Sequence, residues 1–199
     1  MSSPPARPTI ILASRSPRRL ELLRGAGYTV EVVYPNQTAE DDALPGETTP
    51  QLVARLAYQK AADVAARVQQ GLILGCDTVV ECGGQILGKP DNEHHARQIL
   101  RQLRGQRHRV LSGLCLWKKP DRDPLIRVDE TQLEMDHLSD QQIEDYIASG
   151  QWVGKAGAFG YQDQLGWVRV LEGSESNVVG LPMELLETMI LEVQGFSGI

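Results

Sequence analysis

Residues 10–23 constrain the fold more than any other stretch, because a buried strand, a tight turn and a helix start follow one another there. Ile10–Ala13 is a continuous run of apolar or small residues, which favours a short buried strand. Serine is a preferred residue at a helix N-cap, so Ser16 suits that position, and Pro17 suits the first helical position. We therefore expect an α/β unit whose first strand leads through this turn into a helix.

The same turn has the composition of an anion site. Backbone N–H groups and the helix dipole at a helix N-terminus favour negative charge. Arg18 and Arg19 add forked donors that match phosphate oxygens, and Ser16 adds a hydroxyl. Two interpretations follow from this segment alone: a polyphosphate cradle, or an ordinary capped helix with solvated arginines.

Composition narrows the functional class. The 199 residues suit one domain or two small lobes, and the formal net charge of -6 disfavours nucleic acid as a partner. Phe and Trp together number five (2 and 3), too few for stacking platforms beside the basic turn. No apolar run has the length of a membrane span, and the N-terminus lacks a signal-peptide core. We expect a cytoplasmic protein with a flexible tail at 1–7 and a single domain at 8–199, binding neither nucleic acid nor membrane.

Cysteine and histidine do not suggest a metal centre. The three cysteines have no Cys-x-x-Cys spacing, and the four histidines form no ligand motif. A disulfide framework or a zinc site is therefore not expected, and a reducing compartment is the default.

A strong amphipathic helix begins at Thr49-Pro50. Its apolar stripe comprises Leu52, Val53, Leu56, Ala57, Ala61, Val64, Ala65 and Val68. Lys60 falls on that stripe. It is either a snorkelling lysine at the edge of the stripe or a lysine directed into a cleft.

A second constellation joins an acid to a lysine. The apolar run 72–76 reads as a central strand that ends at Asp77, a common place for a catalytic or metal-binding carboxylate. Gly83-Gly84 is a hairpin signal, and the Gly88-Lys89-Pro90 turn presents Lys89 in a defined place. The spacing fits a catalytic pair and a structural salt bridge at the hairpin base equally well.

The remaining pattern alternates strands and helices, which indicates an α/β protein with a mixed sheet. Further strands are expected at 28–34, 109–117, 125–135 and 165–171. Further helices are expected at 92–103, at 140–148 and from 181 to the C-terminal region.

Three loops complete the pattern. The acidic loop 35–47 contains Glu40, Asp41 and Asp42, which either are solvated or recruit a divalent cation. The small-residue segment 154–162 is expected to pack closely against a ligand or another backbone. Residues 173–180 are expected to form a small polar loop.

The ordered series LASRSPRRLELL, RLAYQKA, GCDTVV, ILGKP, LRGQRHRV, GKAGAFGYQ and GSESNVVGLP resembles the Maf family of nucleoside triphosphate pyrophosphatases. The resemblance implies an elongated α/β fold on a mixed sheet, inosine triphosphatase-like, with two lobes around a cleft. It implies a nucleotide diphosphatase, which hydrolyses a nucleoside triphosphate to the monophosphate and pyrophosphate with Mg²⁺ or Mn²⁺. It also fits a house-cleaning role linked to cell-division arrest, and a homodimer.

The resemblance carries roles to individual positions. Those matching catalytic positions are Lys60, Asp77 and Lys89. Those matching substrate-binding positions are Ser16, Arg18, Arg19, Glu40, Thr78 and Gln162. Asp77 and Glu40 would hold the metal. Asp77 would either deprotonate the attacking water or bind the metal that acidifies it, and the sequence leaves both roles open.

The base-reading positions resemble those of the branch acting on thymidine and uridine triphosphates. Arg18 directly follows Ser-Pro, and Gln162 can both donate and accept, which suits the O4 and N3–H edge of thymine or uracil. Four residues depart from the family pattern, namely Gly154, Tyr161, Asp163 and Glu175. Asp163 either accepts from an exocyclic amine, shifting preference toward cytosine or guanine, or faces solvent. The alternative function is a non-catalytic nucleotide-sensing regulator of cell division.

Overall fold

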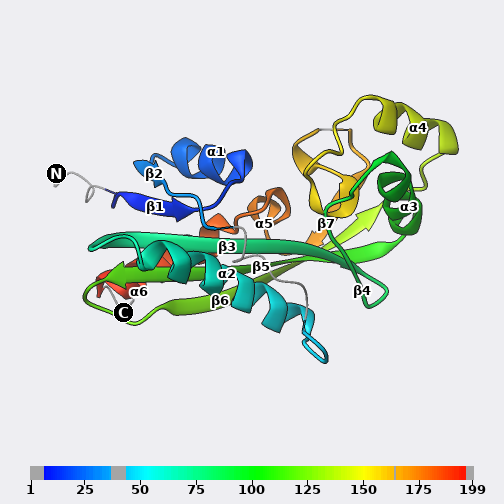
Figure 1. The fold of residues 1–199 in the computed structure, drawn as a ribbon. Helices are drawn as coiled ribbons and strands as arrows, with labels where there is room; N and C mark the ends of the chain where they lie inside the picture. Colours follow the sequence, from blue (N-terminus) through cyan, green and yellow to red (C-terminus); the bar gives the residue numbers. More distant parts are fainter. Residues whose placement is uncertain (1–6, 37–43, 164, 196–199) are drawn as a thin grey trace. The chain divides into compact units, whose positions relative to one another are not determined.

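The computed structural model describes residues 7–36, 44–163 and 165–195 (Figure 1). The strands are β1 (Ile10–Ala13), β2 (Val30–Val32), β3 (Gly71–Cys82), β4 (Gln85–Leu87), β5 (Arg107–Lys119), β6 (Leu125–Met135) and β7 (Val168–Glu172). The helices are α1 (Pro17–Gly25), α2 (Thr49–Ala65), α3 (Glu93–Leu103), α4 (Asp140–Ala148), α5 (Glu175–Val179) and α6 (Met183–Gln194). Two 3₁₀ turns lie at Ala156–Ala158 and Tyr161–Asp163.

The strands form one mixed sheet in the order β2-β1-β3-β5-β6-β7, with β4 paired to β3. β1 is parallel to both β2 and β3, whereas β3 and β4 are antiparallel, as are β6 and β7. The predicted α/β class with a mixed sheet is therefore confirmed. The predicted hairpin at Gly83-Gly84 is also confirmed, because Cys82 pairs with Gln85.

The chain divides into two compact units. The first unit comprises Met1–Asp77, Gly113–Val128 and Met183–Ile199, and the second comprises Thr78–Ser112 and Asp129–Pro182. The boundary in β3 thus falls between Asp77 and Thr78. The predicted single domain at 8–199 stays a prediction. Of the predicted tail, residues 1–6 lie outside the described residues, and Arg7 contacts Glu187 and the Tyr28 ring.

In the first unit, α2 lies across one face of the strands (Figure 1). Its buried stripe packs on residues of β1, β3 and β5, namely Ile11, Ala13, Ile73 and Cys115. Two glycines permit this close approach. A Cβ at Gly75 would lie 2.2 Å from the Ala57 carbonyl oxygen, and one at Gly113 would lie 2.1 Å from that of Val53. The helix therefore rests on backbone, and its side chains are held in register against the strands.

In the second unit, α3 and α4 supply much of the core, which also contains residues of β3, β5 and β6. α3 buries Ala96, Ile99, Leu100 and Leu103, while α4 buries Ile143, Tyr146 and Ile147. An aromatic cluster of Tyr146, Phe159 and Trp167 lies beside α4, with ring centroids 5.6 to 5.9 Å apart. This cluster connects α4 to the small-residue segment that precedes β7.

Several predicted boundaries were wrong. The strand expected at 28–34 is limited to Val30–Val32, because the Tyr28 N–H donates to the Leu23 carbonyl at the end of α1 instead of joining the ladder. The strand expected at 165–171 begins only at Val168. The loop expected at 173–180 contains α5, because Ser174 accepts the Asn177 N–H and caps a helical turn.

Candidate active site

The turn before α1 is built by its hydroxyls. Ser16 is the N-cap of α1, and its side chain accepts the Arg19 N–H at 3.5 Å. The Arg19 guanidinium is buried and donates to Ser14 Oγ at 3.1 Å. Ser14 Oγ also accepts the Ser16 N–H at 3.1 Å. The turn is therefore held by its own side chains, and Arg19 is part of that support.

The neighbouring arginines have different surroundings. Arg15 donates to the Pro35 carbonyl at 3.2 Å and lies over the Tyr34 ring, 5.1 Å from its centroid. Arg18 lies in the first turn of α1 and is half-buried. Since anions favour helix N-termini, Arg18 and Ser16 have the placement expected of a phosphate-binding turn.

Lys60 and Asp77 form a nearly buried ion pair. Lys60 Nζ lies 2.6 Å from Asp77 Oδ1, and the two side chains are 6% and 13% exposed. The snorkelling interpretation of Lys60 is therefore wrong. A lone ammonium on an apolar helix face would lose its hydration without compensation, and the Asp77 carboxylate supplies that compensation.

Asp77 does not end its strand, contrary to the prediction. β3 continues to Cys82, and Asp77 and Thr78 are two partly exposed positions between buried runs. Thr78 Oγ1 lies 2.7 Å from Ser112 Oγ and donates to the Gly180 carbonyl at 3.2 Å. Because a hydroxyl has one proton, the Thr78 proton is used within the second unit. The strand persists because its ladder needs only backbone groups.

The small-residue segment packs against backbone, as predicted. The Gly157 N–H donates to the Gly88 carbonyl at 3.1 Å. A Cβ at Gly157, whose φ is +68°, would lie 2.8 Å from Val80 Cγ2. This hydrogen bond attaches the segment to the turn that carries Lys89, whose side chain is exposed. The predicted site residue Lys89 is thus presented on a tethered turn in the second unit.

Gln162 and Asp163 are adjacent but lie in different environments. Gln162 is exposed in the turn Tyr161–Asp163. The Asp163 side chain is only 8% exposed, and both its oxygens lie 2.6 Å from Lys155 Nζ. Asp163 Oδ2 also accepts the Tyr146 hydroxyl at 2.7 Å. The expectation that Asp163 faces either a base amine or solvent was wrong, because the interior of its own unit binds the carboxylate.

Glu40, the other predicted metal ligand, lies outside the described residues. Within residues 7–36, 44–163 and 165–195, no group of three or more His, Cys, Asp or Glu side chains could hold a metal ion. Among the same residues no helix has the length and hydropathy of a membrane span. Asp77 is thus the described member of the predicted metal pair.

The cysteines are free and buried. Burial raises the pKa of Cys115 to about 12 and also raises the pKa of Cys82. A thiol needs its thiolate form to act as a nucleophile, so neither group suits that role.

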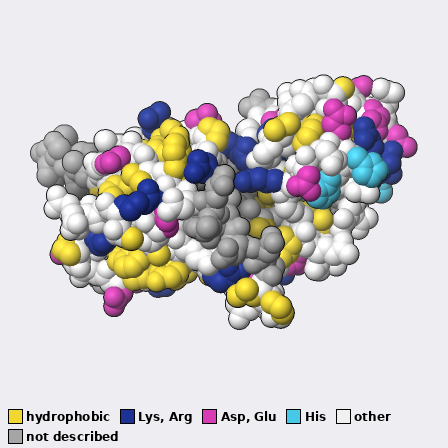
Figure 2. All heavy atoms as spheres, in the orientation of Figure 1, with side chains coloured by type: hydrophobic (Ala, Val, Ile, Leu, Met, Phe, Trp, Pro, Cys, Tyr) yellow, Lys and Arg dark blue, Asp and Glu magenta, His cyan; other side chains and the backbone are white. Residues whose placement is uncertain are grey.

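Surface charge at α3 and α4 is mixed. Figure 2 shows acidic and basic side chains close together there, beside the histidines. Arg97 forms two hydrogen bonds with Glu144, and Arg104 donates to Asp140. This part of the described surface therefore neutralises its own arginines.

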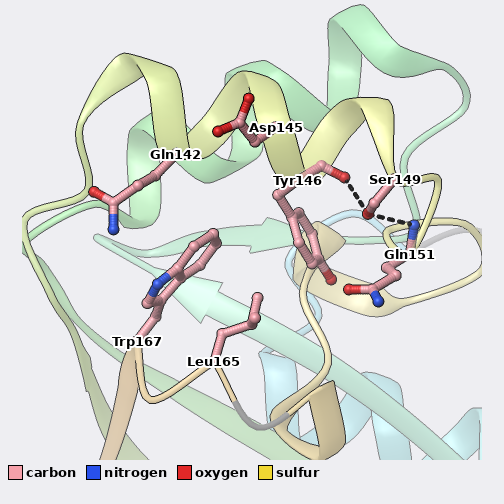
Figure 3. Close-up of a pocket in the computed structure, with 7 residues that line it drawn as sticks. All are labelled: Gln142, Asp145, Tyr146, Ser149, Gln151, Leu165 and Trp167. Atoms are coloured by element: carbon pink, nitrogen blue, oxygen red, sulfur yellow. Dashed lines mark hydrogen bonds between the residues drawn. The ribbon is translucent and has the colours of Figure 1, made fainter.

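A pocket of about 220 Å³ lies beside α4 (Figure 3). It is lined by Gln142, Asp145, Tyr146, Ser149, Gln151, Leu165 and Trp167. None of these residues was singled out from the sequence as functional. Lys155 was also missed as a partner of Asp163, although a lone lysine in a glycine- and alanine-rich segment could have signalled a buried partner.

Comparison with known proteins gives a consistent result. The family model described as Maf-like protein matches residues 9–193. A dTTP/UTP pyrophosphatase of Rhodopirellula baltica is 50% identical over 190 residues, covering 95% of this chain and 84% of the relative. A dTTP/UTP pyrophosphatase of Dictyoglomus thermophilum is 40% identical, covering 91% of this chain and 94% of the relative.

Solved structures support the fold. The Staphylococcus aureus Ham1 protein aligns with a TM-score of 0.51 at 12% identity, covering 92% of this chain and 98% of its own. A HAM1 protein from Coxiella burnetii gives the same TM-score and coverage at 16% identity. These likenesses concern the arrangement of the chain, which agrees with the architecture expected from the sequence.

Proposed function

The chain belongs to the Maf-like protein family, and on that premise we propose that it is a nucleoside triphosphate pyrophosphatase acting on dTTP and UTP. The observation that carries the proposal is the nearly buried Lys60–Asp77 pair, which occupies the two positions where the motifs require catalytic groups. The dTTP/UTP pyrophosphatase that is 50% identical to this chain supports the substrate class.

In the proposed reaction, water cleaves the α–β phosphoanhydride, and the products are the nucleoside monophosphate and pyrophosphate. Asp77 accepts a proton from that water as the new P–O bond forms. Lys60 orients the Asp77 carboxylate, since its ammonium lies 2.6 Å from one carboxylate oxygen. The pair therefore supplies a positioned base in a partly desolvated place.

Charge on the phosphates is neutralised by cationic groups and by N–H donors. Ser16 and Arg18 bind the polyphosphate at the N-terminus of α1, where the helix dipole favours anions. Arg19 supports that turn through Ser14 and adds positive charge. Lys89 stabilises the leaving pyrophosphate from its tethered turn.

Base recognition involves Gln162, with Thr78 and Arg18. The exposed Gln162 amide both donates and accepts, which matches the O4 and N3–H edge of thymine and uracil. Thr78 follows Asp77 in β3, and its hydroxyl is a group that can both donate and accept. Sites that hydrogen-bond a substrate edge reject mismatched bases strongly, because unpaired polar groups are costly.

A divalent cation such as Mg²⁺ or Mn²⁺ fits the donor chemistry. Mg²⁺ is commonly held by one or two carboxylates together with substrate phosphates, and Asp77 provides one carboxylate, with Glu40 as the second. When bound, the cation neutralises phosphate charge and lowers the pKa of bound water.

The proposal is tested with a panel of dTTP, UTP, CTP, GTP and 7-methyl-GTP in the presence of Mg²⁺ or Mn²⁺. Pyrophosphate and orthophosphate are measured separately, without added pyrophosphatase. We expect stoichiometric pyrophosphate, and the highest kcat/KM for dTTP and UTP. Orthophosphate as the first product would indicate a phosphatase, and tight binding without turnover would favour a nucleotide-sensing regulator.

A further inference from the structure

The turn Tyr161–Asp163 is held on both sides of Gln162. The side chains of Tyr161 and Asp163 are each bonded to another part of the second unit, whereas Gln162 between them is exposed. We use the term clamped turn for these three residues. Gln162 is thus exposed to solvent between two residues whose side chains are both bonded to other parts of the unit.

The Asp163 side of the clamped turn is the buried one. Its carboxylate accepts two contacts of 2.6 Å from Lys155 Nζ and one of 2.7 Å from the Tyr146 hydroxyl. The ring of Tyr146 packs against Phe159 and Trp167. Because Tyr146 belongs to α4 and is 3% exposed, the carboxylate is attached to the core of the unit.

The chain passes directly over this ion pair. A Cβ at Gly160 would lie 2.6 Å from Lys155 Nζ and 2.9 Å from each Asp163 carboxylate oxygen. The segment from Lys155 to Asp163 therefore closes on itself, and a side chain at position 160 would have to displace the ends of these two side chains. Such a closed loop fixes the path of the backbone that leads into Gln162.

The Tyr161 side of the clamped turn is more exposed. The Tyr161 hydroxyl donates to Glu175 Oε1 at 2.9 Å, and this hydrogen bond raises the pKa of Tyr161. Glu175 begins α5, which is anchored by the fully buried Asn177. The Asn177 amide donates to the Val110 carbonyl and to Thr131 Oγ1. Both attachments of the turn thus lead to fixed elements.

We propose that Asp163 is a positioning residue for base recognition, which holds the clamped turn so that Gln162 meets the edge of the pyrimidine. This inference rests on the proposed function, from which the role of Gln162 comes. A misplacement of about 1 Å can cost on the order of 100-fold in activity, so an amide that reads a base requires such support. The Asp163 carboxylate acts through the turn and does not touch the base.

The test compares a ligand that has a base with one that lacks it. Asp163→Asn keeps the size of the side chain but removes the charge that binds Lys155. We expect the Kd of dTTP to rise roughly 10- to 100-fold while the Kd of inorganic tripolyphosphate stays unchanged. Lys155→Met is expected to act in the same direction. The dissociation constants are measured by calorimetry under conditions without turnover.

Glu144→Gln is the matched control. It removes the charge that binds Arg97 in the same unit and leaves one oxygen in place of the two that accept hydrogen bonds of 2.6 and 2.7 Å. We expect it to leave both dissociation constants unchanged, so that a general loss of stability is distinguished from a loss of base recognition.

Three outcomes would overturn the inference. Equal weakening of dTTP and tripolyphosphate by Asp163→Asn would show a merely structural role, and no weakening would show no role. A wild type that binds tripolyphosphate but gains nothing from the thymine base would also exclude base recognition. By contrast, a wild type that binds dTTP without hydrolysing it would contradict the proposed function. The inference would then still be decided by comparing the dissociation constants of dTTP and tripolyphosphate.

Discussion

The two units each contain a nearly buried lysine–carboxylate pair with an N–O distance of 2.6 Å, Lys60–Asp77 in the first and Lys155–Asp163 in the second. All four side chains are at most 13% exposed. Among the described contacts, Asp77 is bonded through Oδ1, whereas Asp163 uses both oxygens and also accepts from Tyr146. The two pairs are thus alike in burial and charge. They differ in the acceptor capacity that remains on the carboxylate, which is greater for Asp77 than for Asp163.

This difference distinguishes Asp77, which can accept a proton from the attacking water, from Asp163, which holds a turn in place. A general base needs a lone pair directed at the proton it accepts. Asp77 retains such capacity on Oδ2, while the lone pairs of Asp163 are directed at Lys155 and Tyr146. A buried ion pair is therefore not by itself a sign of catalysis, and the comparison can be tested pair by pair.

The largest expected effect is the loss of the Asp77 charge. Asp77→Asn should lower kcat for dTTP by roughly 100- to 10,000-fold, because the amide cannot accept the proton of the attacking water. The measurement is pyrophosphate release per enzyme, with circular dichroism showing that the fold is retained. Near-normal turnover in a folded variant would exclude Asp77 as base or essential metal ligand.

The second expected effect concerns the free energy of unfolding, and it is the same for both lysine–carboxylate pairs. Removing one partner, as in Lys155→Met or Lys60→Met, should cost about 3–5 kcal/mol of unfolding free energy, because a buried charge is left without compensation. Replacing the whole pair by apolar groups should recover most of that loss. At the second pair the replacement combines Lys155→Met, Asp163→Leu and Tyr146→Phe, so that no hydroxyl is left without an acceptor.

The activities of the replaced pairs should then diverge. Lys60→Met with Asp77→Leu should regain stability and remain inactive, while the triple replacement in the second unit should retain measurable turnover. Urea unfolding and pyrophosphate release measured on the same samples check this. Equal activity of the two replacements would contradict the assignment of chemistry to the first pair.

Much of the fold was predictable because it depends on local patterns. The stripe of α2, the cap at Ser16 and the hairpin at Gly83-Gly84 follow from residue spacing, since each is set by neighbours in the chain. α5 was missed because its five residues have too little periodicity to show a buried face.

For the candidate site, the sequence indicated residues and not the contacts between them. Motifs indicated Lys60 and Asp77 separately, but their pairing depends on the packing of α2 against β3. The environment of Asp163 was not predictable, because its contacts with Lys155 and Tyr146 depend on how the segment around Gly157 packs against α4. Tertiary packing decides which of the two lysine-paired carboxylates has both of its oxygens occupied by hydrogen bonds.

The smallest expected effect concerns a third pair, Arg55–Glu47, which provides a reference without a proposed role in the reaction. Arg55 donates to both Glu47 oxygens at 2.7 and 2.8 Å, and these hydrogen bonds lower the pKa of Glu47 from 4.5 to about 2. A carboxyl whose pKa is lower in the folded state stabilises the fold above its unfolded pKa. That contribution is lost as the pH falls through the folded value.

The Tm advantage of wild type over Glu47→Gln should therefore be full above about pH 4.5 and should shrink as the pH falls toward about 2. The glutamine keeps the shape of the side chain and does not titrate, so the difference in Tm isolates this one carboxyl from all others. Thermal unfolding of both proteins at half-unit steps from pH 6 to pH 2.5 measures it. A difference in Tm that stays constant over this range would mean that Arg55 does not hold Glu47 in its ionised form, and that this short ion pair has no electrostatic consequence. A difference that disappears on acidification would give the scale against which the two buried lysine–carboxylate pairs are judged.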